Sequence, residues 1–307
     1  MTYDKLILVT RKTRLQQLVA RFNTRGQAKF YLEHAGGDFT DYQREDDAYV
    51  RALEVLHRAF DGGLKLQAID RELVPTFLFA PGDVVVAVGQ DGLVANIAKY
   101  AGAQPVVAVN PDPGRFDGIL LPFGPHQAGA AIGRVVAGTA RIRSITLAEA
   151  RLADGQRLLG FNDLFVGARS HVSARYTLRA AARAETQSSS GVLISTGAGS
   201  TGWLSSMFNM ATGLAAFTGG AAGAPMQLGW EDPRLVFVVR EPFASKHSAC
   251  SLVAGVVAPG EALELASLMP SGGVIFSDGV EADALAFNAG ATVRIGAAAQ
   301  RTRLVVA

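Results

Sequence analysis

The chain has 307 residues, of which 49% are hydrophobic and 18% charged, which is enough apolar sequence for packed cores and excludes intrinsic disorder. Its net charge is only +2, with Lys and Arg scattered along the chain, so we expect neither nucleic acid nor an acidic membrane as a partner. The single cysteine, Cys250, excludes an intramolecular disulfide and a cysteine-based zinc site, and we expect a soluble cytoplasmic protein.

The first 125 or so residues contain short apolar runs that alternate with helical stretches. The runs at 6–9, 64–69, 84–88 and 106–109 are typical of buried parallel strands. Residues 48–60 and 93–101 carry apolar side chains at helical spacing. This alternation predicts an N-terminal open α/β domain, which we place at residues 1–127.

From about residue 140 the pattern changes to short β-like runs bounded by Gly, Pro, Asn or Asp. These runs lie at 144–147, 176–179, 235–239, 251–257, 262–268, 274–276 and 292–295. Closely spaced strands of this kind predict a second, β-rich and sandwich-like domain at residues 128–307. Residues 213–229 are rich in Gly and Ala, and we expect a mobile loop or a weak helix there.

A glycine-punctuated turn follows the apolar run 84–88 and precedes the helical run 93–101. The turn reads Gly89-Gln90-Asp91-Gly92. A strand that enters a turn and then a helix directs backbone N–H groups and a helix N-terminus at one point, which suits phosphate oxygens. The alternative is an ordinary β–α turn in which Asp91 caps the helix.

A second run of small residues, from 196 to 202, follows an apolar run at 191–195 and precedes a helix that we expect through Met210. Ser200 and Thr201 offer hydroxyl groups there. The glycines fit G-x-G-x-x-G, but the surrounding sequence lacks the βαβ unit of a dinucleotide-binding fold. Neither run contains the lysine of a Walker A loop.

The turn at 89–92 resembles the Gly-Gly-Asp-Gly-Thr loop of the NAD kinase family, which it matches at Gly89, Asp91 and Gly92. The resemblance implies that this loop, Gln90 included, holds the phosphates of ATP, with Mg²⁺ or another divalent cation bridging them. It also implies that Asp91 is the base that deprotonates the ribose 2′-hydroxyl of NAD.

Two positions in the loop depart from the family pattern, Gln90 and Leu93. If position 90 needs a positive φ, glutamine there costs about 1 kcal/mol or more, and its side chain competes for phosphate space. Leu93 replaces a hydroxyl donor. These departures leave open weak activity, another phosphoryl donor, or a binding protein without turnover.

Three further segments resemble family motifs that contact the dinucleotide. Residues 199–201 resemble the Thr-Gly-Ser-Thr-Ala-Tyr segment, and residues 161–166 resemble a segment with an Asn-Glu/Asp pair that holds ribose or nicotinamide groups. The implied contacts are Asn162, Asp163, Thr196, Gly199, Ser200, Thr201 and the aromatic Trp203 beside a base. The alternatives are an Asn-Asp turn between strands and a tryptophan in a core or an interface.

Residues 109–118, 240–242 and 277–279 resemble the mitochondrial-type branch of the family, which extends the resemblance across nearly the whole chain. It implies nucleotide contacts from Asn110 and Asp278, and a homodimer or homotetramer. Arg115 either meets phosphate or lies exposed. The five histidines lie far apart without ligand spacing, so we expect no dedicated transition-metal site.

The resemblance thus predicts an ATP-dependent NAD kinase that produces NADP. One alternative is a catalytically weakened nucleotide-binding or regulatory protein of the same fold. Another is a kinase of lipids or of other small hydroxyl compounds, because such enzymes share the Gly-Gly-Asp-Gly loop.

Overall fold

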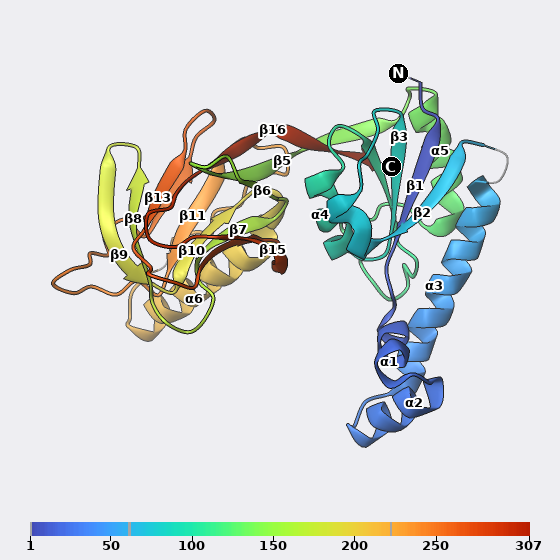
Figure 1. The fold of residues 1–307 in the computed structure, drawn as a ribbon, viewed down its shortest axis with the longest axis horizontal. Coiled ribbons are helices and arrows are strands. Elements are labelled where there is room, and N and C mark those ends of the chain that lie inside the picture. Colours follow the sequence, from blue (N-terminus) through green and yellow to red (C-terminus); the bar gives the residue numbers. More distant parts are fainter. Residues whose placement is uncertain (1, 61–62, 222) are drawn as a thin grey trace. The chain divides into compact units, whose positions relative to one another are not determined.

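Buried β-strands form the centre of two separate units of the chain (Figure 1). The computed structural model describes residues 2–60, 63–221 and 223–307. Unit 1 comprises Met1–Arg143 and Thr302–Ala307, and unit 2 comprises Ser144–Arg301. The chain therefore leaves unit 1 once and returns to it for its last residues.

Unit 1 is built on a parallel sheet with the strand order β2-β1-β3-β4-β16. The strands are β1 (Lys5–Thr10), β2 (Lys65–Asp70), β3 (Asp83–Val88), β4 (Pro105–Val109) and the C-terminal end of β16 (Thr292–Val306). The first four confirm the predicted strands, but β2, at the edge of the sheet, is largely exposed, so the expectation of a buried strand is wrong there. Every residue of β3 and β4 is buried, as expected for parallel strands that are covered on both faces.

Helices cover both faces of this sheet (Figure 1). On one face, α3 (Phe39–Phe60) and α5 (Ala128–Val136) share a core with valines of β3 and β4. On the other, α4 (Asp91–Tyr100) packs against β3 and the 3₁₀ helix Arg71–Thr76. Because α5 belongs to this core, unit 1 continues to Arg143, beyond the predicted boundary between residues 127 and 128.

Two short helices that the sequence analysis does not predict precede α3. They are α1 (Arg14–Phe22) and α2 (Arg25–His34), and they form a small core of Leu15, Leu32 and Phe39 with the start of α3. Thr13 begins α1 with a capping box, in which its hydroxyl and the Gln16 side chain bond each other's backbone N–H groups.

Unit 2 is a two-layer arrangement of β-sheets, which confirms the β-rich, sandwich-like prediction. One layer contains β5 (Arg141–Leu152), β6 (Arg157–Gly160), β8 (Ala174–Ala180), β9 (Arg183–Ser189), β13 (Leu263–Ser267) and the start of β16. The other is antiparallel, with the order β12-β11-β10-β7-β14-β15. Its strands are β7 (Asp163–Ala168), β10 (Gly191–Ser195), β11 (Leu235–Arg240), β12 (Ala254–Val257), β14 (Gly273–Ser277) and β15 (Val280–Ala286). A single hydrophobic core fills the space between the two layers.

Helix α6 (Trp203–Phe217) packs on the outer face of the six-stranded sheet. Leu204 and Met207 of this helix meet Leu193 of β10 and Val236 of β11. The helix is longer than the predicted one, and the described residues between 218 and 229 form neither helix nor strand. The segment 213–229, predicted as a mobile loop or a weak helix, therefore belongs to α6 up to Phe217, and its described residues after that have no regular secondary structure.

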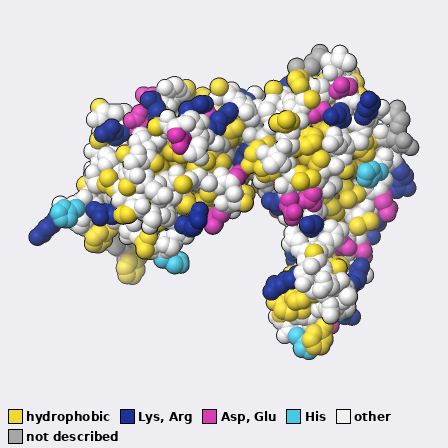
Figure 2. Space-filling view, in the orientation of Figure 1, with side chains coloured by type: hydrophobic (Ala, Val, Ile, Leu, Met, Phe, Trp, Pro, Cys, Tyr) yellow, Lys and Arg dark blue, Asp and Glu magenta, His cyan; other side chains and the backbone are white. Residues whose placement is uncertain are grey.

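The described surface carries charges of both signs. On the face shown in Figure 2, basic side chains are dispersed among acidic and apolar ones within each unit. Among the residues of 2–60, 63–221 and 223–307, no helix has the length and apolar character needed to cross a lipid bilayer.

Candidate functional site

The predicted phosphate turn connects β3 to α4 in unit 1. Gly89 is buried, and its N–H donates to the carbonyl oxygen of Val109 at 3.2 Å. A Cβ atom at Gly89 would lie 3.0 Å from the Leu93 side chain and 3.3 Å from Nε of Arg11, so the close packing favours glycine. The next three residues place the N-terminus of α4 at the surface, with its first N–H groups free of intrahelical partners.

Gln90 departs from the family loop without backbone strain. It is the N-cap of α4 with φ −121° and ψ 166°, a conformation that any residue adopts. Position 90 therefore does not need a positive φ, and the strain that glutamine would cost under that condition is absent. Its side chain is exposed and makes no capping bond. The difference from the family loop at this position is therefore an exposed side chain at the mouth of the turn.

Leu93 does not face the pocket as the hydroxyl residue of the family motif would. Its side chain is buried, with 2% exposed, so it contributes to the core of unit 1 instead of facing a ligand. The substitution of the family's hydroxyl residue therefore adds apolar packing beneath the turn, next to Gly89.

Asp91 is the first residue of α4, not its N-cap, so the capping alternative is wrong. One oxygen of its carboxylate accepts a hydrogen bond from the backbone N–H of Leu120 at 2.8 Å. This bond joins the start of α4 to the loop that follows β4. A carboxylate at the first turn of a helix is also favoured by the helix dipole.

A pocket of about 420 Å³ opens beside this turn, within unit 1. Its lining consists of Gln90, Asp91, Gly92, residues 115–119 and Leu121. The structure therefore brings the predicted phosphate turn together with the loop after β4.

Asn110 shapes this loop from within. It is buried, its amide nitrogen donates to the carbonyl oxygen of Phe116 at 2.8 Å, and its amide oxygen accepts from the N–H of Asp112 at 3.0 Å. Both ends of the carboxamide are thus engaged in holding the loop that lines the pocket. Asn110 would therefore affect nucleotide binding by holding this loop in shape.

An ion-pair network that the sequence analysis missed borders the same pocket. Arg115, which lines the pocket, donates to the carboxylate of Asp41 at 2.7 Å, and Arg14 contacts the same carboxylate at 3.0 Å. Arg14 and Arg11 in turn bond the buried Glu45. Burial opposes ionisation of Glu45, but the bonds from Arg14 and Arg11 outweigh it and hold the pKa of its carboxyl below the ordinary value.

The second small-residue run connects β10 to α6 in unit 2 through a short 3₁₀ helix, Ala198–Thr201. A Cβ atom at Gly199 would collide with the carbonyl oxygen of Asn162, and one at Gly197 would collide with that of Gly229. These glycines are thus required by close backbone packing inside the protein.

The hydroxyl groups of this run differ in what they can reach. Thr196 is fully buried and donates to the carbonyl oxygen of Phe161 at 2.6 Å. The Ser200 hydroxyl is buried, bonds the carbonyl oxygen of Thr196 and accepts from the N–H of Leu228. Thr201 is exposed, so it is the hydroxyl of this run that a ligand reaches without rearrangement.

Asp278 is brought against the predicted Asn162-Asp163 pair. Its carboxylate accepts hydrogen bonds from three successive backbone N–H groups, those of Phe161 at 2.9 Å, Asn162 at 2.6 Å and Asp163 at 3.3 Å. In return, the N–H of Asp278 donates to the carbonyl oxygen of Asp163 at 3.1 Å. Asp278 therefore faces the backbone of the pair.

Asp163 begins β7 and is only 7% exposed. Burial, with a further contribution from the negative charge of Asp278, raises the pKa of its carboxyl to about 7. The family resemblance assigns the Asn162-Asp163 pair to ribose or nicotinamide groups. The structure places the Asp163 side chain where the acid form persists to neutral pH.

Trp203 stacks on Phe165 of β7, with ring centroids 5.6 Å apart and an interplanar angle of 12°. Phe165 stacks in turn on Phe276 of β14 at 4.8 Å, and the guanidinium of Arg240 lies 5.3 Å from the Trp203 ring. Trp203 is half-buried, so part of it stays accessible to a ligand. Phe165, Phe276 and Arg240 extend this group beyond the predicted residues.

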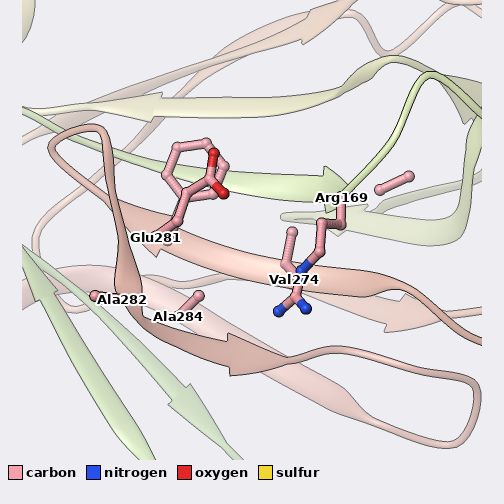
Figure 3. A pocket seen from close by; sticks show the side chains of 7 residues that line it. Arg169, Val274, Glu281, Ala282 and Ala284 are labelled. Atoms are coloured by element: carbon pink, nitrogen blue, oxygen red, sulfur yellow. The ribbon is translucent and has the colours of Figure 1, made fainter.

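A second pocket, of about 350 Å³, continues from this aromatic group across β14 and β15 (Figure 3). Phe276 and Val274 line it together with Arg169 and Glu281, and Figure 3 shows the guanidinium of Arg169 beside Val274. No motif in the sequence marks this pocket, because its residues come from three strands and their ends.

The described residues contain no group of three or more His, Cys, Asp or Glu side chains that could hold a metal ion. The predicted site residues fall into two sets. Those at 89–92 and Asn110 lie in unit 1, and the rest lie in unit 2.

Comparisons with known proteins address the fold. The sequence matches no protein-family profile and no curated protein. Its structure is similar to that of yeast NADH kinase complexed with NADH, with a TM-score of 0.59 and 15% identity, covering 100% of this chain and 84% of the other. It is also similar to an NAD kinase from Archaeoglobus fulgidus in complex with ATP, with a TM-score of 0.53 and 17% identity, covering 98% and 93% of the two chains. The resemblance predicted from the motifs is confirmed at the level of the fold, and the chain has the fold of NAD and NADH kinases.

Proposed function

We propose that this protein is an NAD kinase, which transfers a phosphoryl group from ATP to the 2′-hydroxyl of the adenosine ribose of NAD and so produces NADP. The observation that carries the proposal is the position of Asp91. It is fixed at the start of α4, in a glycine turn that lines a pocket of about 420 Å³. The fold, shared with an NADH kinase and an NAD kinase, supports it.

In this proposal, Asp91 receives the proton of the attacking hydroxyl. The bond from Leu120 occupies one carboxylate oxygen and orients the side chain, so the geometry needed for proton transfer is prepared before substrate binds. The exposed N–H groups at the start of α4 are placed to bind phosphate oxygens.

Arg115 is the cation that lines the same pocket. It is bound to Asp41, whose side chain is 44% exposed, so an arriving phosphate competes with a carboxylate that water partly screens. Arg115 therefore supports the phosphate-binding role of this pocket.

The residues of unit 2 are proposed to bind the dinucleotide. Trp203 offers part of an aromatic face to a base, and Thr201 offers an exposed hydroxyl beside it. The Asn162-Asp163 pair, held by Asp278, is proposed to bind ribose or nicotinamide groups.

The family resemblance also implies a divalent cation such as Mg²⁺. The described residues do not gather a ligand set for it, although Asp91 and Asp117 both line the phosphate pocket. A cation that arrives with ATP would supply neutralisation of the phosphate charge, and Asp91 and Asp117 are the carboxylates of this lining that would hold it. A homodimer or homotetramer in the cytoplasm completes the proposal.

The second candidate is a nucleotide-binding protein of the same fold with little turnover. The exposed Gln90 side chain favours it, because that side chain lies at the mouth of the phosphate turn. The backbone does not favour this candidate, because φ at Gln90 is ordinary and the turn is not strained there.

The test is NADP formation from ATP, Mg²⁺ and NAD, measured by an enzyme-coupled assay for the native protein and for Asp91→Asn. The asparagine keeps an oxygen for the N–H of Leu120 but cannot take a proton. Turnover by the native protein that Asp91→Asn loses supports the proposal. Binding of NAD by calorimetry without turnover supports the second candidate, and neither binding nor turnover with any dinucleotide contradicts both.

A further inference from the structure

Asp278 occupies a turn that predetermines its backbone. It is the first of two residues between the paired Ser277 and Val280, and both turn residues have positive φ, 54° at Asp278 and 70° at Gly279. Asp-Gly and Asn-Gly are the sequences that such a two-residue hairpin favours. The turn therefore accepts either aspartate or asparagine at this position.

The carboxylate, by contrast, has a task that an amide does not fulfil. Three successive N–H groups, those of Phe161, Asn162 and Asp163, point at its two oxygens. Converging backbone N–H groups form an anion-binding concavity and favour the charged form of a carboxylate. An asparagine would direct its own N–H₂ group at one or more of these donors.

Asp163 lies next to this anion and has the opposite surroundings. It is buried, and its cross-strand neighbour on β10 is the uncharged Ser195. In the described chain, Asp278 is the charged group that acts on it, and no donor or cation offsets its burial. Burial first, and the neighbouring negative charge second, oppose the ionisation of Asp163, so its acid form persists toward neutral pH.

We propose that Asp163 is a protonated hydrogen-bond donor in this site, and that Asp278 is a positioning residue that adds to the effect of burial by holding a negative charge beside it. Because only the proposed function assigns Asp163 to the dinucleotide, its role toward NAD rests on that function. There Asp163 donates to an acceptor oxygen of NAD, such as a ribose or carboxamide oxygen, and the ionised form loses this bond.

The first experiment needs no ligand. Carbon-13 NMR of the native protein labelled at aspartate carboxyl carbons, compared with Asp163→Asn, identifies the resonance of Asp163. We expect it to titrate with a midpoint near 7, in line with its raised pKa. A midpoint below pH 5 overturns the proposal.

The same titration in Asp278→Asn tests the positioning role. The hairpin tolerates this change, but the negative charge is lost, so we expect the Asp163 midpoint to move to lower pH. An unchanged midpoint overturns the role of Asp278. If this variant does not fold, as shown by circular dichroism, the comparison of the native protein with Asp163→Asn still decides the protonation of Asp163.

Calorimetry with NAD then tests the donor role. The dissociation constant of the native protein is expected to rise about tenfold from pH 6 to pH 8, because the acid form is lost around neutrality. Asp163→Asn keeps an N–H donor that does not titrate, so its affinity is expected to stay constant. Equal pH profiles overturn the donor role, whereas a neutral midpoint by NMR with no NAD binding at any pH contradicts the proposed function and leaves the protonation of Asp163 standing.

Discussion

The side chain of Asp91 accepts a 2.8 Å hydrogen bond from the backbone N–H of Leu120, which joins the start of α4 to the loop after β4. Leu120 is 6% exposed, so little water could reach its N–H group if the hydrogen bond to the Asp91 carboxylate were lost. The residue proposed as the catalytic base is thus also a structural link.

Asp91→Ala is therefore expected to destabilise unit 1. It leaves the N–H of Leu120 without its acceptor, at a cost of about 1–3 kcal/mol, whereas Asp91→Asn retains an oxygen and costs less than about 1 kcal/mol. Urea unfolding of the two variants measures the difference. Equal free energies of unfolding would show that the bond to Leu120 contributes nothing.

Asp91→Asn is for this reason the variant that isolates the chemistry. We expect it to lower turnover by about 10²–10⁴-fold, the usual contribution of a general base, with the affinity for NAD little changed. Single-turnover kinetics with NAD and ATP measure the effect. A loss below tenfold would assign the proton transfer to another group.

Gln90→Gly and Gln90→Ala separate two readings of the departure from the family loop. With φ at −121°, there is no strain to release, so the glycine is expected to add no stability and to lose up to about 1 kcal/mol through backbone freedom. If the side chain occupies phosphate space, both variants bind ATP more tightly than the native protein. Calorimetry with ATP decides, and tighter binding by glycine alone would indicate that the backbone is what restricts the loop.

Strands β1, β3 and β4 could be predicted from sequence because each contains a continuous apolar run that is buried in the parallel sheet. The edge strand β2 is different, because it mixes polar with apolar residues and is largely exposed. The helices α1 and α2 are short, and their apolar pattern is weak evidence by itself. The signal that would have found α1 is local: Thr13 and Gln16 stand at the spacing of a capping box.

The local geometry of the candidate site, a strand followed by a turn and a helix, was predictable where it lies in one segment, as at 89–92 and 199–203. The site was not predictable where distant residues meet. The sequence marks Asp278-Gly279 as a turn, but it does not show that the Asp278 side chain reaches the backbone of Phe161, more than one hundred residues earlier in the chain. The bond between Arg115 and Asp41 is of the same kind.

Gly199→Ala is expected to disrupt the turn between β10 and α6. Its methyl group would collide with the carbonyl oxygen of Asn162, which is backbone and cannot swing aside, so we expect a loss of several kcal/mol, in the range of severe overpacking. Gly213→Ala is the matched control, because it lies inside α6 and, apart from its chain neighbours and the backbone of its own helix, no atom lies within 4 Å of the added methyl group.

The control is expected to gain about 0.5–1 kcal/mol, since alanine is the better helix former. Thermal and chemical unfolding of both variants check the pair. If Gly199→Ala were as stable as the native protein, the close approach of Gly199 to Asn162 would have to be looser than described.

The raised pKa of Asp163 makes a prediction for stability as a function of pH. The folded chain holds this proton up to a pH of about 7, whereas the unfolded chain releases it near the ordinary aspartate value of about 3.9. Between these values the folded state binds more protons than the unfolded state. The contribution of Asp163 to the free energy of unfolding is therefore largest below about pH 4 and is lost as the pH rises through 7.

Asp163→Asn removes this dependence, so its free energy of unfolding relative to the native protein is expected to rise between pH 4 and pH 7, by on the order of 1–4 kcal/mol, and then to level off. Guanidinium unfolding at several pH values measures it. Asp154→Asn is the control of opposite sign: hydrogen bonds from the backbone and side chain of Gln156 lower the pKa of this exposed carboxyl, so the native stability it provides is lost only as the pH falls. A constant difference between native protein and Asp163→Asn would mean that Asp163 ionises in the folded state as it does in the unfolded chain.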